Sequence, residues 1–247
     1  MSFFHITPSM ALPPAVPGDL TLLYYTANRS DEGFCERVRH HLQFLAAPGL
    51  PIISISHKPL AFGQNICVGD IGFSAYNIYE QILMGARAAR TPWVATCDDD
   101  FLYAPSHFAL RPPRDMFGYD YSRWMLDEDG TYWWRTRTTM GMCIAERALM
   151  IDTLEERFAK FPTRILDRQK LKGWGEPGRY EGNLGLRDRK MLIFGAQGPS
   201  LTFNHRPSLG GKRKRCPDDL LTKDLTPWGD GKALVDWFYD GKGEPRV

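Results

Sequence analysis

The 247-residue chain has no uninterrupted apolar stretch of the length that crosses a membrane. The longest weakly polar stretch, residues 41–57, is broken by Pro48, Gly49 and Pro51. Residues 1–19 show no basic segment followed by an apolar run, so they do not read as a secretion signal. The 5 cysteines are few, odd in number and without a C-x-x-C pair, which argues against a disulfide framework or a zinc site. We therefore expect no membrane span and a reducing, cytoplasmic location.

Acidic residues are absent from residues 189–217, whereas the whole chain carries a formal net charge of only +2. We expect this basic segment to bind phosphate groups. Its basic residues are Arg189, Lys190, Arg206, Lys212, Arg213, Lys214 and Arg215. A hydrophobic content of 43% with 24% charged residues excludes a disordered, collagenous or coiled-coil protein and fits one large globular domain.

The first half of the chain alternates between strand and helix patterns. Apolar runs at 20–25, 51–56 and 93–97 predict buried strands, because each is short, apolar and bounded by polar or turn residues. Helical spacing of apolar residues predicts helices over 34–45 and 74–89, with Ser74 as the N-cap of the second. A βαβαβ order of this kind predicts a mostly parallel sheet that binds ligands at the carboxyl ends of its strands.

The second half has a less regular pattern. Residues 105–113 read as a loop, and 131–139 as a strand along a cleft. The predicted elements that follow are a strand entering a helix over 142–158, a turn-rich loop at 173–178, a short helix at 180–190 and a final strand at 191–195. The aromatic residues of 117–137 are candidates for stacking on a sugar or a base, and core packing is the alternative. Trp133 and Trp134 are adjacent, so only one of them can face the cleft.

Three aspartates, Asp98, Asp99 and Asp100, directly follow the third predicted strand. Neighbouring carboxylates repel one another, and a divalent cation with a preference for oxygen ligands, Mg²⁺ or Mn²⁺, would neutralise them. The alternative is an acidic turn that caps the next element.

Residues 72–105 resemble the part of GT-A glycosyltransferases in which a helix and an apolar strand lead to the D-x-D motif. The resemblance implies that Asp98 reaches the ribose or base of a nucleotide sugar and that Asp100 holds the metal, with Asp99 between them. The end of the first strand cradles the nucleotide in that family. The residues at this place are Thr26, Asn28 and Arg29.

Two further segments resemble that family. The loop and helix at 173–190 are similar to the acceptor loop and base-bearing helix of inverting GT-A enzymes, which implies Glu181 as catalytic base, with Glu176 as the other candidate. Gly182 stands where an aspartate is usual, and an acidic residue at a helix N-terminus is the alternative for Glu181. Near the end of the basic segment, His205 resembles a late metal ligand and Lys212 a lysine that contacts the diphosphate. Residues 140–143 would form the floor under the donor sugar.

The resemblance implies an α/β fold of GT-A type, Rossmann-like, with a mostly parallel central sheet, flanking helices and a smaller antiparallel region on the acceptor side. We expect one catalytic domain over 1–247. Its predicted parts are an irregular arm at 1–18, a nucleotide-sugar half at 20–103, an acceptor half at 104–215 and a C-terminal extension at 216–247.

The predicted function is metal-dependent transfer of a hexosyl or pentosyl group from a nucleoside-diphosphate sugar to a hydroxyl acceptor. The basic run at 212–215 and the aromatic stretch fit a hydroxylated base in DNA, which would place the enzyme in a host cytoplasm if a phage encodes it. A cytoplasmic glycan, lipid-linked or protein acceptor fits almost as well. A non-catalytic nucleic-acid-binding module is the alternative of another class. A nucleotidyltransferase also uses paired aspartates, but no glycine-rich triphosphate loop is evident.

Overall fold

The computed structural model of the chain describes residues 4–5, 18–46, 49–134, 137–162, 174–209 and 211–242. Most of the predicted arm at 1–18 lies outside these residues. An eight-stranded sheet forms the centre of the molecule. Its strands are β1 (Phe4–His5), β2 (Leu20–Thr26), β3 (Ile52–Ser56), β4 (Gln64–Cys67), β5 (Trp93–Asp98), β7 (Met116–Asp120), β10 (Cys143–Glu146) and β11 (Lys190–Phe194).

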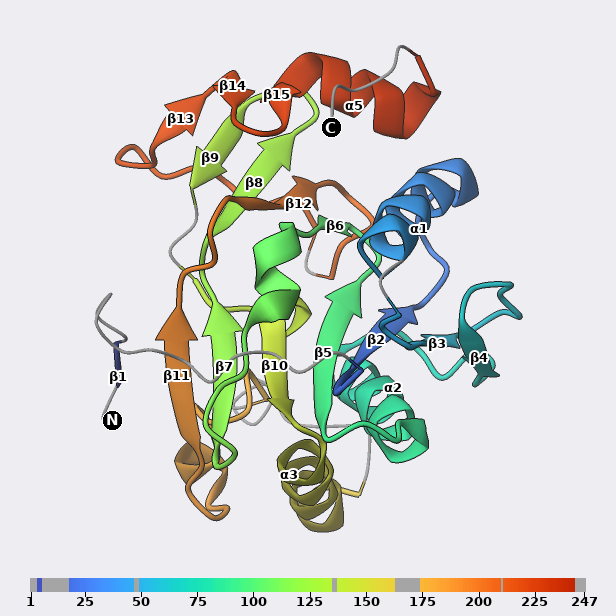
Figure 1. Ribbon diagram of the computed structural model, residues 1–247, viewed down its shortest axis with the longest axis vertical. Helices are drawn as coiled ribbons and strands as arrows, with labels where there is room; N and C mark the ends of the chain where they lie inside the picture. The colour runs from blue at the N-terminus through green and yellow to red at the C-terminus, as the bar shows by residue number, and fades with distance from the viewer. Residues whose placement is uncertain are drawn as a thin grey trace.

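The order of this sheet is β1-β11-β7-β10-β5-β2-β3-β4 (Figure 1). Every neighbouring pair is parallel except the two pairs that β10 makes with β5 and β7. The helices are α1 (Glu32–Ala46), α2 (Ala75–Ala88), α3 (Arg147–Lys160) and α5 (Gly231–Asp240), with 3-10 turns η1 (Pro105–Ala109), η2 (Met140–Met142) and η3 (Gly182–Leu184). The predicted mixed α/β fold, with a mostly parallel sheet flanked by helices, is confirmed.

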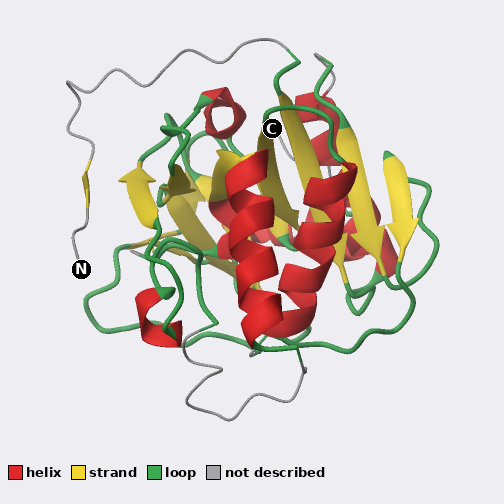
Figure 2. Ribbon diagram, turned by 90° about the horizontal axis from the view of Figure 1, so that it is seen from below, coloured by secondary structure: helices red, strands yellow, loops and turns green. Residues whose placement is uncertain are grey.

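Alternation along β2 covers both faces of the sheet, since successive side chains of a strand point to opposite sides. Leu23 and Tyr25 belong to the core cluster that also holds apolar residues of α2 and α3. Leu22 and Tyr24 belong to another cluster that contains Leu42 of α1. Helices α2 and α3 therefore lie together on one face, as Figure 2 shows, and α1 covers the other.

The start of α2 is fixed as predicted, because the Ser74 Oγ accepts a hydrogen bond of 3.3 Å from the Asn77 N–H. Near its end, Gly85 lets the helix approach the sheet closely. A Cβ at this position would lie only 2.6 Å from the Ile55 Cδ1 atom.

A second, five-stranded sheet lies beyond the carboxyl ends of β2 and β5 (Figure 1). Its order is β13-β9-β8-β12-β6, and only β8 and β12 are parallel among its pairs. The strands are β6 (Phe101–Leu102), β8 (Arg123–Asp127), β9 (Tyr132–Trp134), β12 (Ser200–Asn204) and β13 (Leu221–Thr222); β14 (Asp224–Leu225) and β15 (Gly229–Asp230) form a separate pair. One face of this sheet, with Leu201 and Phe203, packs against α1 and α5.

Several expectations for the second half are corrected. Residues 191–195 are not the final strand, because β12 and α5 follow. In place of the predicted helix over 180–190, the structure has the 3-10 turn η3, and Lys190 begins β11. Strands β4, β7 and β8 were not predicted, and the second sheet is mixed where an antiparallel one was expected. β7 pairs with β11 and β8 with β12, which are distant in sequence, so no local pattern defines these two strands. β4 is a four-residue edge strand beside the nearby β3 and is too short to show a strand pattern. Among the described residues, no helix is both long and apolar enough to cross a membrane.

Candidate active site

The three aspartates stand at the carboxyl end of β5, beside the end of β2. Tyr25 and Asp98 are partners across this strand pair, and the Tyr25 hydroxyl donates a hydrogen bond of 3.0 Å to the Asp98 Oδ2. The Thr26 hydroxyl donates one of 2.5 Å to the Asp99 Oδ2. The parallel register thus brings two hydroxyl groups of one strand to two carboxylates of its neighbour.

Burial and mutual repulsion make these carboxylates costly in their charged form. Burial, and then the charges of Asp100 and Asp99, raise the pKa of Asp98 well above its ordinary value. Burial and the Asp100 charge raise the pKa of Asp99 to about 6, although the hydrogen bond from Thr26 acts in the opposite direction. A positive charge placed among these groups would relieve both effects.

Asp100 is 6% exposed and faces the loop after β12. Its Oδ2 accepts a hydrogen bond of 2.7 Å from the Ser208 hydroxyl and lies 3.3 Å from the His205 Nε2. Its Oδ1 is buried and has no hydrogen-bond partner among the described residues. One carboxylate oxygen from each of the three aspartates lies within 4.8 Å of the others. This set of hard oxygen atoms, one of them unsatisfied, fits Mg²⁺ or Mn²⁺.

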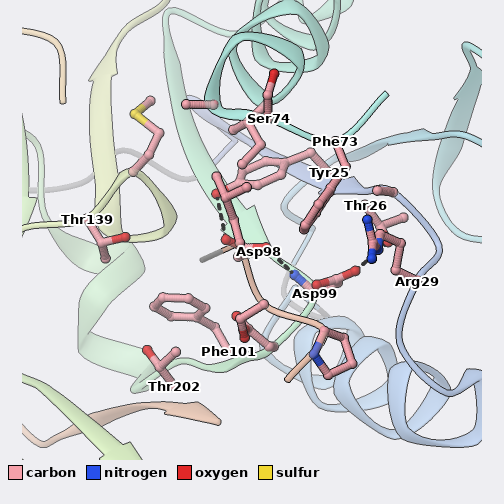
Figure 3. A pocket seen from close by; sticks show the side chains of 18 of the residues that line it. Tyr25, Thr26, Arg29, Phe73, Ser74, Asp98, Asp99, Phe101, Thr139 and Thr202 are labelled. Carbon is pink, nitrogen blue, oxygen red and sulfur yellow. Dashed lines mark hydrogen bonds between the residues drawn. The ribbon is translucent and has the colours of Figure 1, made fainter. Parts of the chain in front are cut away.

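The aspartates face a cleft of about 430 Å³. Figure 3 shows its two sides: Phe73 and Arg29 lie on one side of Asp98, and Phe101 and Thr202 on the other. A volume of this size accommodates a ligand with several ring systems.

On the first side, Arg29 makes a cation–π contact with Phe73, and its guanidinium carbon lies 4.2 Å from the ring centroid. The preceding Asn28 does not line the cleft. Its φ of 51° is in the left-handed region that asparagine tolerates, and its N–H donates to the Thr26 Oγ1 at 2.9 Å. Asn28 therefore shapes the turn that presents Thr26 and Arg29.

The loop after α3 brings one of the two candidate bases into the cleft. Glu176 lines it, together with Trp174 and Gly175. Glu181 is 1% exposed and is not among the lining residues. Its Oε1 accepts two hydrogen bonds from the Arg157 guanidinium, and its Oε2 accepts one of 2.7 Å from the Gly178 N–H. The Glu181 carboxylate thus holds the loop to α3.

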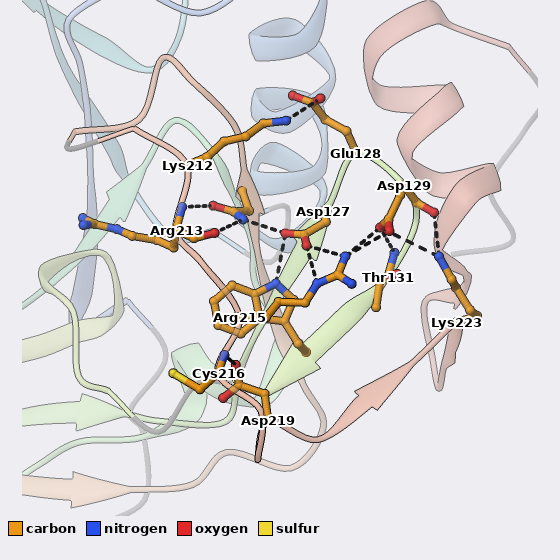
Figure 4. A network of polar contacts seen from close by, with 12 residues as sticks. Asp127, Glu128, Asp129, Thr131, Lys212, Arg213, Arg215, Cys216, Asp219 and Lys223 are labelled. Carbon is orange, nitrogen blue, oxygen red and sulfur yellow. Dashed lines mark hydrogen bonds and ion pairs between the residues drawn. The ribbon is translucent and has the colours of Figure 1, made fainter.

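The basic run at 212–215 meets the acidic turn between β8 and β9 (Figure 4). The Lys212 Nζ lies 2.6 Å from the Glu128 Oε2, and Lys212 is not among the lining residues of the cleft. The Arg215 guanidinium binds both Asp127 and Asp129. Arg213, by contrast, lines the cleft. Much of the positive charge seen in the sequence is therefore compensated within the protein.

The structure brings most of the predicted site residues to one place. The predicted residues that line the cleft are Thr26, Arg29, Asp98, Asp99, Asp100 and Glu176; His205 contacts Asp100 from outside the lining. Asn28, Glu181 and Lys212 take other positions. Of the predicted floor at 140–143, Met140 lines the cleft, next to Thr139, and residues 141–143 are not among the lining residues. Lining residues that were not predicted include Phe73, Arg123, Thr138 and Thr202. Arg123 and Thr202 could have been found only from the strand alternation in β8 and β12.

The chain matches no protein-family model and no curated protein. Solved structures with some likeness include the bifunctional IspDF from Campylobacter jejuni, with a TM-score of 0.41, 11% identity and coverage of 73% of this chain and 50% of that chain. The present chain thus spans half of that protein. A glycosyltransferase involved in glycosylation of the major capsid of PBCV-1 has a TM-score of 0.40 and 12% identity, and the match covers 71% of this chain and 81% of that chain. A nucleotidyl transferase from Methanothermobacter has a TM-score of 0.40 and 12% identity, and the match covers 70% of this chain and 86% of that chain. At these identities and TM-scores, the likeness says nothing about the chemistry of this chain.

Proposed function

We propose that this protein is a glycosyltransferase that moves a hexosyl or pentosyl group from a nucleoside-diphosphate sugar to a hydroxyl acceptor. The observation that carries this proposal is the set of three partly or fully buried aspartates at the carboxyl end of β5, facing a cleft of about 430 Å³. The GT-A-like order of elements around residues 72–105 supports it.

Asp98 and Asp100 would hold Mn²⁺ or Mg²⁺, with His205 beside Asp100 as a further candidate ligand. When bound, the cation would supply charge stabilisation for the diphosphate leaving group. Tyr25 and Thr26 orient the Asp98 and Asp99 carboxylates by their hydrogen bonds. We assign the nucleoside to the side of the cleft that carries Arg29 and Phe73, where an aromatic face and a guanidinium offer stacking surface.

We assign the catalytic base to Glu176 in place of Glu181. A base must reach the acceptor hydroxyl with a free carboxylate oxygen. Glu176 lines the cleft, whereas both oxygens of Glu181 are bound by Arg157 and Gly178. Glu176 would accept the proton of the acceptor hydroxyl as that oxygen attacks the anomeric carbon and the nucleoside diphosphate departs.

Arg213 lines the cleft and would contact the diphosphate. The role predicted for Lys212 would require its ion pair with Glu128 to open. A DNA acceptor bound through residues 212–215 would likewise require the pairs of Arg215 with Asp127 and Asp129 to open. For this reason we name the acceptor only as a hydroxyl compound.

The test is titration calorimetry of UDP, GDP, CDP and dTDP into the protein with and without Mn²⁺. We expect one nucleotide to bind only in the presence of the metal, and the Asp100→Asn variant, which is nearly isosteric, to lose this binding while it melts at a similar temperature. Metal-independent binding to both proteins would contradict the proposal. Incubation with the matching nucleotide sugar should release nucleoside diphosphate. Release of pyrophosphate from a nucleoside triphosphate would instead identify a nucleotidyltransferase.

A further inference from the structure

The second sheet has two faces of opposite character. Leu201 and Phe203 of β12 face the apolar cluster with α1 and α5. Thr202, which lies between them, lines the cleft, as does Arg123 of the neighbouring β8. Strand alternation thus gives the sheet one face toward the core and one toward the cleft, and the cleft face carries Arg123 and Thr202 beside Met125.

The cleft lining contains two buried hydroxyl groups, one on β12 and one in the segment before η2, that lack hydrogen-bond partners among the described residues. The Oγ1 atoms of Thr202 and Thr138 are buried without a hydrogen-bond partner among the described residues, and these residues are 6% and 8% exposed. A buried hydroxyl without a partner is unfavourable in the free protein and gains by binding a ligand oxygen. Both threonines line the same cleft.

A guanidinium lies on the same wall. Arg123 is 7% exposed, donates a hydrogen bond of 3.4 Å to the Arg137 carbonyl oxygen, and lies 5.9 Å from the Phe101 ring centroid. Arg137 and Arg213 also line the cleft. The three aspartates, in contrast, stand at the end of β5, and the Phe101 ring lies between Asp98 and Thr202 in Figure 3.

We propose that Arg123, with the Thr138 and Thr202 hydroxyls, binds an anionic group, a phosphate or a carboxylate, carried by the acceptor. Guanidinium groups bind such anions in a planar, two-point geometry, and burial strengthens the interaction. The assignment of this anion to the acceptor rests on the proposed function. Binding of the anion itself does not require a donor or a metal.

The experiment measures binding of four probes by calorimetry without nucleotide or metal: glucose, glucose 6-phosphate, glucuronate and inorganic phosphate. We expect at least one anionic probe to bind about tenfold or more tightly than glucose, as a charge-assisted hydrogen bond provides. The tighter of the two sugar acids identifies phosphate or carboxylate as the recognised group. Equal affinity of glucose and both sugar acids, or no binding of any anion at tens of millimolar, would overturn the proposal.

Variants locate the site. Arg123→Gln should lower the affinity for the preferred anion about tenfold, and Arg123→Lys should lower it less, because it retains the charge but not the two-point geometry. Thr202→Val keeps the shape and should weaken binding severalfold, which preserves the test if the Arg123 variants do not fold. Arg215→Gln is the matched control, since Arg215 pairs with Asp127 and Asp129 away from the cleft lining. Wild-type affinity in both Arg123→Gln and Thr202→Val would refute the site.

A final titration tests whether the anion occupies an acceptor site or the site of the donor diphosphate. The preferred anion is titrated into wild-type protein saturated with Mn²⁺ and the nucleoside diphosphate that binds. Simultaneous binding is expected, and complete displacement would show that Arg123 serves the donor diphosphate. If no nucleoside diphosphate binds at all, the proposed function fails, while anion binding that depends on Arg123 would still establish the site.

Discussion

Glu176 and Glu181 lie close in sequence but do different things in the structure. Replacing Glu176 by Gln should lower kcat by about 10²- to 10⁴-fold with little change in donor affinity, because a positioned base is lost. Replacing Glu181 by Gln should instead lower the free energy of unfolding by about 3 kcal/mol, since the buried Arg157 guanidinium loses its counter-charge. Steady-state kinetics and urea unfolding of both variants separate the roles. A slow but fully stable Glu181→Gln enzyme would return the base assignment to Glu181.

Asp120 gives the protein a pH-dependent contribution to stability. Burial raises its pKa, but hydrogen bonds from His107 and from the Ser122 and Ala196 N–H groups outweigh burial, so the pKa is lowered. The charged carboxylate therefore stabilises the fold above the ordinary aspartate pKa of about 4, and this contribution is lost as the pH falls through the lowered value.

Asp120→Asn should accordingly melt well below wild type at pH 7, and the difference in Tm should shrink steadily below about pH 4. Thermal melts of both proteins across this range test the assignment. Asp115→Asn is the matched control, because Asp115 is exposed and its ion pair with Lys190 lies at the surface. A constant difference in Tm between Asp120→Asn and wild type would exclude a role for the Asp120 charge.

At the scale of elements, Gly130 in the β8–β9 turn packs directly against the backbone of α5. A Cβ on Gly130, whose φ is +76°, would lie 2.4 Å from the Lys232 backbone nitrogen. Gly130→Ala should therefore lower the free energy of unfolding by more than about 2 kcal/mol, through backbone strain and displacement of α5.

Gly229 is a close control for this prediction. It has a similar φ of +71° but open space where its Cβ would lie. Gly229→Ala should lower the free energy of unfolding only by the strain of a left-handed residue, about 1 kcal/mol. Urea unfolding gives both values, and equal effects would mean that the packing of α5 contributes little.

The elements that the sequence predicts are those whose signal is local. The strands at 20–25 and 93–97, the Ser74 cap and the placement of residues 98–100 at a strand end all follow from short patterns and are found in the structure. β8 and β12 are far apart in the chain, so their parallel pairing, and the arrival of Arg123 at the cleft, follow only from tertiary structure. The same limit applies to Glu181, whose place in a segment that resembles the base-bearing helix of inverting GT-A enzymes suggested a base and whose contact with Arg157 shows a structural role.

For the molecule as a whole, the distribution of charge predicts weak affinity for nucleic acid. The acidic turn at 127–129 occupies Lys212 and Arg215, which the sequence alone presents as free basic groups. We expect little binding of duplex DNA at physiological salt. The Glu128→Gln and Asp129→Asn double variant should bind more tightly, with a salt slope steeper by about 0.9 for each released phosphate contact.

Fluorescence anisotropy with a labelled duplex over a range of salt concentrations tests this expectation. Lys232→Gln and Asp236→Asn together provide a control, because that ion pair lies on α5 and not on the basic run. Tight, metal-independent binding by the wild-type protein would support the nucleic-acid-binding alternative over the enzyme.

The two different faces of the second sheet also affect how the ligand selectivity of such a protein can evolve. Arg123, Met125 and Thr202 line the cleft, whereas Leu126 and Leu201 belong to the core cluster and do not line it. Because the two sets occupy different faces, mutations in the first can alter selectivity without disturbing the packing that the second maintains. A combinatorial library restricted to Arg123, Met125 and Thr202 would accordingly yield mostly folded proteins with divergent preferences.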